Sequence, residues 1–350
     1  MNKNLKTLPP GIIPGQALSA LAPMQDITDL SFMTVVNNCG APDYFFTEFI
    51  RVHEHSIIEE KILNSITKNP SNQPVFAQLI GENLPNLARI TKELLKYPIA
   101  GIDLNLGCPA PKIYKKNVGG GLLRDVEKID EILGLLRQTI PGLFTVKMRI
   151  GFDDTENFNP ILQLINKHQI DLLSVHGRTV KELYRGDVHY DLIKQAVETV
   201  NCPVFANGNI TSVEKALWTL NYTASYGVMI GRSAIRNPWI FRQLREHLGG
   251  LNYFKPTLKN VYEYIQTLTE ATSWENIQEL THINRMKKFL NFIGQGVDAE
   301  GNFLHEVRRT TSYKTLFSVC KKYLLDNENS TQPFATEPHE GLIARPNCEN

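Results

Sequence analysis

Two kinds of segment alternate along the first 250 residues of the chain. Short runs rich in β-branched and aromatic residues are typical of buried strands, and longer segments with apolar residues every three to four positions are typical of helices. Strand-like runs cover residues 18–22, 43–47, 74–80, 101–106, 144–149, 171–176, 203–206 and 226–230. Helical periodicity covers residues 84–97, 126–138, 160–168, 191–200, 213–220 and 234–248.

Strands that alternate with helices predict a parallel sheet. Eight such units within about 230 residues match the size of a closed (β/α)8 barrel, and an open, doubly wound sheet is the alternative. After residue 250 only helical patterns follow, over residues 261–271, 274–293 and 304–325. We therefore predict an α/β fold in which a TIM barrel (18–250) follows an N-terminal extension (1–17). A smaller, all-helical C-terminal domain (251–325) and a disordered tail rich in Asn, Pro, Glu and Thr (326–350) complete the chain.

Composition and charge narrow the class of protein. The chain has 350 residues, 42% of them hydrophobic, which is ordinary for a globular protein. No run of about 18 apolar residues predicts a membrane span, and the first 16 residues lack the apolar segment of a secretory signal. The five cysteines show neither a disulfide framework nor a C-x-x-C zinc motif. We expect a cytoplasmic protein with no membrane contact and no metal.

The balanced charge hides a basic segment. The whole chain carries 37 Lys+Arg against 36 Asp+Glu, a net charge of +1, which gives no simple argument for a polyanionic partner. Residues 281–325, however, hold eight Lys or Arg against three Asp or Glu, an excess of five. This segment is either a solvated helix face or a surface for a polyanion.

Polar residues follow nearly every predicted strand, where a barrel places its active site. Lys147 and Arg149 are two positions apart, so they share a face of their strand. A lysine in the barrel mouth needs an anionic partner, either a ligand or a structural carboxylate. His176 ends an apolar run and precedes Gly-Arg-Thr, which favours a ligand contact over a core position.

The last two predicted strands end in glycine-containing segments, Asn207-Gly208-Asn209 and Gly231-Arg232. Glycine lets the backbone approach a ligand closely, and helix N-termini attract anions. Barrels often bind phosphate after strands 7 and 8, so we favour a phosphate site over simple tight turns. A phosphate site and a lysine without a metal cluster suggest a phosphorylated cofactor, either flavin mononucleotide (FMN) or pyridoxal phosphate.

Cys108 ends the fourth predicted strand within a Gly-Cys-Pro turn and has no metal-ligating partner at a suitable spacing. A thiol in this position acts as a nucleophile or a proton donor, unless it is inert. The connection over residues 109–125 is long for such a loop and contains three consecutive glycines, so we expect a lid.

Taken together, these motifs resemble the tRNA-dihydrouridine synthases. The segments that carry the resemblance lie in order over residues 18–245, and the most specific are D-L-N-L-G-C-P (103–109) and G-G-G-L-L (119–123). The others cover residues 21–24, 28–29, 47–49, 146–149, 175–179, 207–209 and 230–232, with a looser H-x-x-R-x-x-K at 282–288. Gln25-Asp26, where members often have Ala-Gly, and Phe289, where many have histidine, depart from the family pattern.

The resemblance implies an FMN-dependent oxidoreductase that reduces the C5–C6 double bond of specific uridines in tRNA to 5,6-dihydrouridine. It implies a hydride from reduced FMN, a proton from Cys108, re-reduction of the flavin by NADPH or NADH, and a monomer that binds tRNA. The implied FMN contacts are Pro23, Met24, Gln25, Gln78, Lys147, His176, Asn207, Gly208, Asn209, Gly231 and Arg232. The implied substrate contacts are Asn105, Arg149, Arg178, Arg285, Lys287 and Lys288.

Two other functions compete with this one. A different flavin barrel, of the dihydroorotate dehydrogenase or enone reductase kind, would act on a free small molecule. A non-catalytic RNA-binding module would carry no flavin. The basic helical segment favours tRNA over a small substrate, and the predicted cofactor site favours an enzyme over a binding module.

Overall fold

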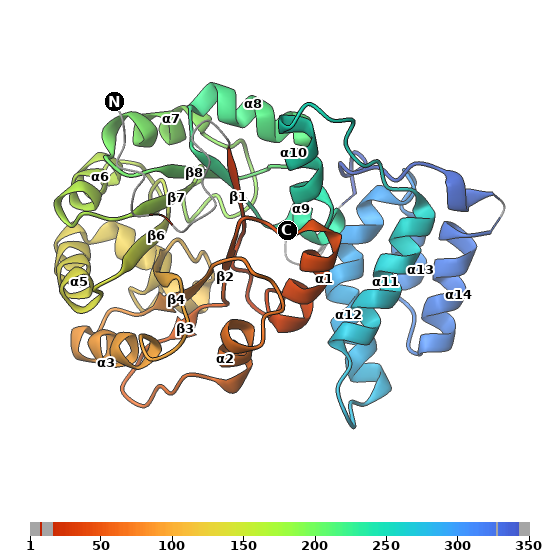
Figure 1. Ribbon diagram of the computed structural model, residues 1–350, viewed down its shortest axis with the longest axis horizontal. Helices are drawn as coiled ribbons and strands as arrows, with labels where there is room; N and C mark the ends of the chain where they lie inside the picture. Colours follow the sequence, from red (N-terminus) through yellow and green to blue (C-terminus); the bar gives the residue numbers. More distant parts are fainter. Residues whose placement is uncertain (1–7, 9–16, 327, 343–350) are drawn as a thin grey trace. The chain divides into compact units, whose positions relative to one another are not determined.

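The computed structural model describes residues 8, 17–326 and 328–342 (Figure 1). The chain divides into two compact units. The barrel unit comprises residues 1–30, 42–210 and 214–230, and the helical unit comprises residues 31–41, 211–213 and 231–350.

Eight parallel strands of the barrel unit close into a ring, which confirms the predicted TIM barrel and excludes the open sheet. β1 pairs with β2 on one side and β9 on the other, and β2 pairs with β4. The ring strands are β1 (Leu18–Leu21), β2 (Tyr44–Phe46), β4 (Val75–Ile80), β5 (Gly101–Leu106), β6 (Leu143–Arg149), β7 (Leu172–His176), β8 (Val204–Asn207) and β9 (Gly227–Ile230). The sequence pattern missed β3 (Ile50–Arg51), a two-residue strand that pairs with β4.

Helices surround these strands (Figure 1). Their starts follow from local chemistry, because Asn83 and Asp125 each accept a hydrogen bond from a backbone N–H of the first helical turn. The helices are α2 (Glu60–Thr67), α3 (Leu84–Leu94), α4 (Pro111–Tyr114), α5 (Val126–Thr139), α6 (Phe158–Lys167), α7 (Tyr190–Thr199) and α8 (Val213–Thr223). A 3-10 helix, η2 (Gly119–Arg124), lies between α4 and α5.

The barrel interior changes from apolar to polar along the strands. One cluster of buried apolar side chains comes mainly from the amino-terminal halves of the strands and includes Tyr44, Phe76 and Phe205. Leu8, which lies within the predicted extension, is buried in this cluster. Two positions beyond Phe76 on the same face of β4 is Gln78, which is fully buried. The carboxyl ends of the strands therefore carry the polar groups.

The helical unit contains α1 from Ser31 onward and all the helices after β9. The helices are α1 (Leu30–Gly40), α9 (Arg232–Arg236), α10 (Ile240–Leu248), α11 (Leu258–Thr272), α12 (Glu279–Ile293), α13 (Asn302–Val307) and α14 (Tyr313–Leu324), with 3-10 helices η3 (Gly294–Gly296) and η4 (Asn329–Thr331). The single helix predicted over 234–248 is two helices, because Pro238 disfavours a helical conformation at Asn237. The helix predicted over 304–325 is also two, since Ser312 starts α14 with a capping box.

Residues 328–342 are ordered against the helical unit, in contrast to the predicted disorder of the tail. Phe334 is buried, and Pro333 forms an isolated β-bridge with Thr257. Arg236 donates from Nε to the Thr336 carbonyl at 2.8 Å. The remaining predicted tail, residues 343–350, lies outside the described residues. In the part of the chain that the structure describes, no helix is long and apolar enough to cross a membrane.

Candidate active site

Cys108 is fixed at the carboxyl end of β5 by the side chain of Asn105. The Asn105 Oδ1 atom accepts hydrogen bonds from the backbone N–H groups of Gly107 and Cys108, at 2.9 and 3.0 Å. An asparagine that bonds to the backbone two and three residues ahead stabilises a tight turn. The predicted substrate residue Asn105 is therefore also the residue that shapes the turn bearing the thiol.

The three consecutive glycines pack against this turn. A Cβ atom on Gly120 would lie 2.5 Å from Val180 Cγ2 and 2.8 Å from the Cys108 carbonyl oxygen, and one on Gly121 would lie 2.5 Å from the Tyr114 carbonyl oxygen. Arg124 adds hydrogen bonds to the Tyr114 and Gly121 carbonyls. The buried residues of η2 thus pack against the turn that bears Cys108, and the lid over residues 109–125 stays a prediction.

The electrostatic surroundings of Cys108 favour a protonated thiol. Burial raises its pKa, while the Ala110 backbone N–H and the positive charges of Lys147, Arg149 and Arg51 lower it to a smaller extent. A nucleophilic cysteine needs a lowered pKa, so that the thiolate is populated at neutral pH. The net upward shift instead favours a group that keeps its proton until it donates it.

Lys147 projects from β6 close enough to Cys108 for their charges to interact. Burial and the like charge of Arg149 lower its pKa to about 8, and Asp103 and Cys108 oppose this shift. No ion pair with a carboxylate involves Lys147 within the described residues. The structure therefore favours a ligand-facing ammonium over the alternative of a structural ion pair.

A chain of buried side-chain hydrogen bonds leads to Asn105. The Thr145 hydroxyl donates to Asp103 Oδ1 at 2.5 Å, and Gln78 Nε2 donates to Asp103 Oδ2 at 2.7 Å. Asn105 Nδ2 then donates to Gln78 Oε1 at 2.8 Å. Gln78, a predicted flavin contact, is thus a link between two residues of β5, and its amide is fully buried.

Arg149 is buried and holds the loops of the barrel mouth through backbone carbonyls. Its Nε donates to the Gly107 carbonyl at 3.1 Å, and its Nη1 donates to the Thr179 and Leu183 carbonyls, both at 2.7 Å. These contacts join the turn bearing Cys108 to the loop after β7. The predicted contact of this arginine with substrate stays a prediction.

Arg178 is also buried and holds the residues that follow β7 and β8. Its Nη2 donates to the Gly186 carbonyl at 2.7 Å, and its Nη1 donates to Asn209 Oδ1 at 3.3 Å. Like that of Arg149, its predicted contact with substrate stays a prediction.

The ends of β7 and β8 bring four predicted cofactor residues together. His176 and Asn207 are paired in register and buried, and Asn207 Nδ2 donates to the Met229 carbonyl at 2.7 Å. Gly208 has a φ of 129°, which favours glycine, and Tyr190 donates from its hydroxyl to the Gly208 carbonyl at 2.9 Å. Asn209 follows with a φ of 46°, in a left-handed turn.

The remaining predicted phosphate residues, Gly231 and Arg232, come directly after β9 and belong to the helical unit. Gly231 precedes the first residue of the five-residue helix α9. Their position next to the last strand of the ring is the one that the sequence predicts.

The segment after β1 forms a turn and leads to a carboxylate that the sequence prediction missed. The Met24 backbone N–H donates to Thr28 Oγ1 at 2.9 Å, and Pro23 and Met24 are half-buried. Gln25 is exposed and donates from Nε2 to Glu48 Oε2 at 3.2 Å. Glu48 is buried after β2, and burial raises its pKa to about 7 although Lys61 lies 3.5 Å away.

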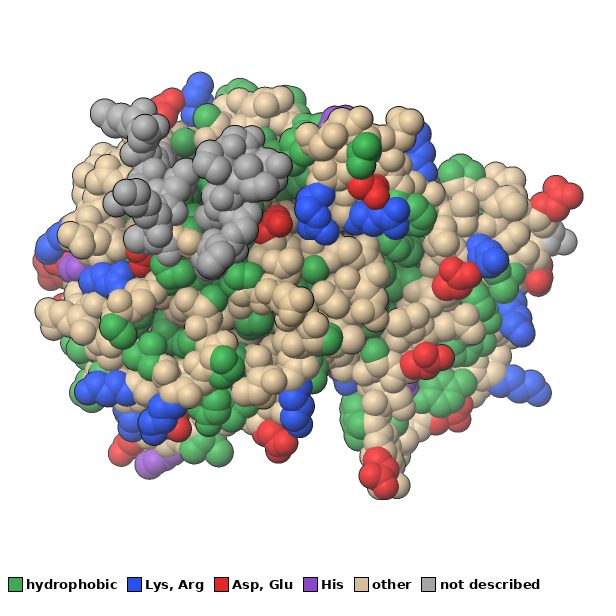
Figure 2. All heavy atoms as spheres, in the orientation of Figure 1, with side chains coloured by type: hydrophobic (Ala, Val, Ile, Leu, Met, Phe, Trp, Pro, Cys, Tyr) green, Lys and Arg blue, Asp and Glu red, His purple; other side chains and the backbone are tan. Residues whose placement is uncertain are grey.

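The predicted RNA contacts Arg285, Lys287 and Lys288 lie on α12 and are half-buried. The Arg285 guanidinium lies 5.3 Å from the ring centroid of Trp274, whose side chain is half-exposed. Phe289 is fully buried, with its ring 5.6 Å from that of Phe32 on α1, so this departure from the family pattern serves packing. On the face drawn in Figure 2, basic and acidic side chains of the helical unit are mixed.

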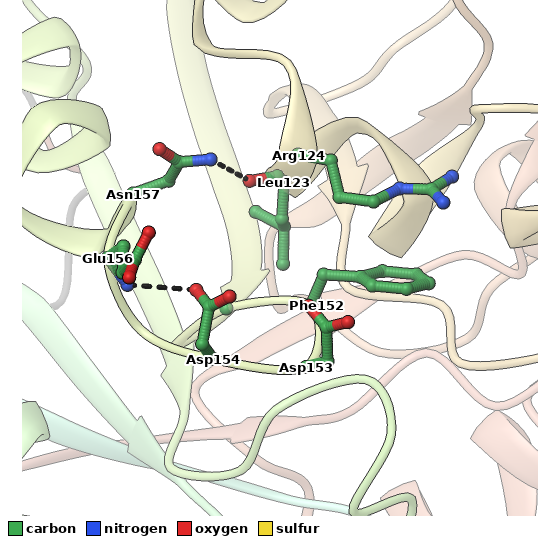
Figure 3. A pocket seen from close by; sticks show the side chains of 8 residues that line it. Leu123, Arg124, Phe152, Asp153, Asp154, Glu156 and Asn157 are labelled. Atoms are coloured by element: carbon green, nitrogen blue, oxygen red, sulfur yellow. Dashed lines mark hydrogen bonds between the residues drawn. The ribbon is translucent and has the colours of Figure 1, made fainter.

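A separate pocket lies beside the loops that follow β5 and β6 (Figure 3). Its lining residues are Leu123, Arg124, Gly151, Phe152, Asp153, Asp154, Glu156 and Asn157. The Arg124 guanidinium lies 4.1 Å from the Phe152 ring centroid, and Asn157 Nδ2 donates to the Leu123 carbonyl at 3.0 Å. Over the described ranges, no group of His, Cys, Asp or Glu side chains could hold a metal ion, including the acidic residues here.

Four residues of the site were not predicted: Arg51, Glu48, Asp103 and Thr145. Asp103 and Thr145 had a detectable signal, because each is a polar residue inside an apolar strand run and two positions before a predicted site residue. Glu48 lies within residues 47–49, one of the segments that carry the resemblance, but no role was predicted for it. Arg51 had no signal, since the pattern did not predict β3.

A closed barrel that gathers a thiol, a lysine and a buried amide–carboxylate chain at the carboxyl ends of its strands defines an enzyme of the (β/α)8 class. Comparison with known proteins specifies the family. The family model described as "Dihydrouridine synthase (Dus)" matches residues 20–328 of this chain. The chain belongs to this family of flavin-dependent oxidoreductases.

Three curated relatives illustrate the similarity. A probable tRNA-dihydrouridine synthase of Helicobacter pylori (strain J99) is 35% identical over 297 residues, which cover 77% of this chain and 89% of the relative. The tRNA-dihydrouridine synthase B of Pasteurella multocida is 33% identical over a region that covers 63% of this chain and 67% of the relative. The tRNA-dihydrouridine(16) synthase of Neisseria meningitidis serogroup B is 30% identical over a region that covers 82% of this chain and 89% of the relative.

Proposed function

We propose that this protein reduces the C5–C6 double bond of specific uridines in tRNA to 5,6-dihydrouridine, with FMN bound at the carboxyl end of the barrel and Cys108 as the proton donor. The observation that carries the proposal is the position of Cys108 at the end of β5, where Asn105 accepts from its backbone N–H and Lys147 is close enough for the two side-chain charges to interact. We further propose that the protein acts as a monomer in the cytoplasm, with NADPH or NADH as the reductant.

The residues present fit a flavin. The polar groups at the strand ends combine one cation, Lys147, with the imidazole of His176 and the amide of Asn207, which suits a ring system rich in carbonyl oxygens and nitrogens. The left-handed backbone at Gly208 and Asn209, together with Gly231 and Arg232 after β9, would hold the phosphate. Pro23, Met24 and Gln25 would line the ring from the end of β1, and Gln78 would face it from β4.

When bound, reduced FMN supplies the hydride that adds to C6 of the uracil. Cys108 donates the proton from Sγ to C5, and water then restores the proton on the thiolate. Positioned general acids contribute about 10²–10⁴-fold to rate. Asn105 orients the uracil ring next to Cys108, and Lys147 places a positive charge where negative charge develops.

Access to the uracil requires that the nucleotide leaves the stacked tRNA. We propose that Arg285, Lys287 and Lys288 bind the tRNA backbone, because phosphate contacts by Lys and Arg give affinity without regard to sequence. The half-exposed Trp274 beside Arg285 offers an aromatic surface in the same region of the helical unit.

The test uses purified, full-length protein, an unmodified tRNA transcript and NADPH or NADH. We expect a yellow protein that forms dihydrouridine in the tRNA, measured by mass spectrometry of the nucleosides, and that leaves free uridine monophosphate unchanged. Equal turnover of the free nucleotide and the tRNA would favour a small-molecule reductase. A colourless protein that binds tRNA without reducing it would favour a binding module.

A further inference from the structure

The chain of buried hydrogen bonds that ends at Cys108 has a defined direction. Asp103 on β5 is fully buried and accepts from Thr145 at 2.5 Å and from Gln78 at 2.7 Å. Gln78 accepts from Asn105 at 2.8 Å. Asn105 in turn accepts from the backbone N–H of Cys108 at 3.0 Å. Every donor in the chain therefore points toward Asp103.

The charge of Asp103 imposes this direction. An ionised carboxylate can only accept hydrogen bonds, whereas a side-chain amide can present either its oxygen or its nitrogen to a neighbour. Because Gln78 must turn its NH2 group toward Asp103, its oxygen faces Asn105. Asn105 must then turn its own NH2 group toward Gln78, which leaves its oxygen facing the backbone N–H groups of the Cys108 turn.

We propose that Asp103 is a positioning residue for the reduction: its carboxylate orients the amides of Gln78 and Asn105 and thereby holds the Cys108 thiol in its reactive place. The proposal rests on the function proposed above for Cys108. Because its side chain has no exposed surface, Asp103 acts through Gln78 and Asn105 and through the effect of its charge on Lys147.

The position of Asp103 makes this orientation dependent on pH. Burial raises its pKa to about 6, and the hydrogen bonds from Thr145 and Gln78 and the charge of Lys147 on β6 limit that shift. Above pH 6 the carboxylate is ionised and accepts from both neighbours. Below pH 6 one of the Asp103 oxygens carries a proton and faces the hydrogen-bond donor of Thr145 or Gln78. That oxygen no longer accepts, so the orienting effect is lost as the pH falls through this value.

Three variants of the full-length flavoprotein test the proposal. Asp103→Leu removes the anchor of the chain and is expected to lower kcat for dihydrouridine formation about 10²-fold, since misplacement of a catalytic group by about 1 Å costs that much. Asp103→Asn keeps the shape but not the charge, so kcat should no longer decrease below pH 6.

Thr145→Val is the matched control, because it removes one donor to Asp103 but leaves the hydrogen bond from Gln78. It should move the acid limb of the pH profile upward, since the lost hydrogen bond stabilised the carboxylate. Wild-type kcat in Asp103→Leu would overturn the proposal. So would an acid limb near pH 6 that persists in Asp103→Asn, a result that remains decisive if Asp103→Leu fails to fold.

A second readout separates this proposal from the proposed function. The rate at which iodoacetamide alkylates Cys108 is measured by peptide mass spectrometry, with Cys39 as the internal reference. Asp103→Leu should change the rate at Cys108 several-fold and leave the rate at Cys39 unchanged. If the wild type forms no dihydrouridine but this difference is present, the proposed function fails and the positioning role stands. Equal rates at Cys108 in both proteins would refute the positioning role.

Discussion

Replacement of Arg149 by methionine tests how the barrel mouth is held together. The buried guanidinium donates to the carbonyls of Gly107, Thr179 and Leu183. Each buried polar group left without a partner costs about 1–3 kcal/mol, so three carbonyls without their donor cost at least about 3 kcal/mol. We therefore expect Arg149→Met to destabilise the mouth by about 3–5 kcal/mol.

Hydrogen exchange followed by mass spectrometry measures this effect locally, which suits a chain of two units better than a single unfolding midpoint. Protection of residues 107–120 and 179–183 should fall about 10²–10⁴-fold, the equivalent of that free energy. Arg149→Lys keeps the positive charge near Cys108 but reaches fewer carbonyls, so its loss should be smaller. Protection in Arg149→Met equal to that of the wild type would refute this view of the mouth.

Three further predictions concern other parts of the site. Gly120→Ala should lower dihydrouridine formation about 10²-fold, because its Cβ would press on the Cys108 carbonyl, whereas Gly142→Ala, with open space around it, should have no effect. Affinity for FMN, measured by flavin fluorescence, should decrease as the pH rises through about 8, where Lys147 loses its charge, and Lys147→Met should remove this dependence. Replacement of the three basic residues of α12 by glutamate should weaken tRNA binding at every salt concentration without loss of flavin. These residues are Arg285, Lys287 and Lys288.

The order of the barrel strands could be predicted because parallel strands with both faces buried are continuous apolar runs. Each predicted run overlaps a strand of the ring, and polar residues mark the carboxyl end of nearly every one. The two-residue strand β3 could not be predicted, since its pairing with β4 depends on a neighbour far along the chain. The break at Asn237 was visible in the sequence as a proline and was missed.

The candidate site was only partly predictable for a related reason. Cys108 and Lys147 stand out by type and position, and the structure brings them together. The roles of Arg149 and Arg178 could not be read from the sequence, because an arginine that binds a substrate and one that binds backbone carbonyls look alike. Burial of Glu48 and Asp103 depends on side chains from neighbouring strands, which no local pattern reveals.

The central claim is that the thiol of Cys108 protonates C5 of a uridine in tRNA. Stopped-flow absorbance of Cys108→Ala tests it most directly, because it separates the two half-reactions of the flavin. We predict that NADPH or NADH bleaches the flavin of this variant at the wild-type rate, and that tRNA restores the colour about 10²–10⁴-fold more slowly. Reoxidation by tRNA at the wild-type rate, with dihydrouridine formed, would contradict the claim.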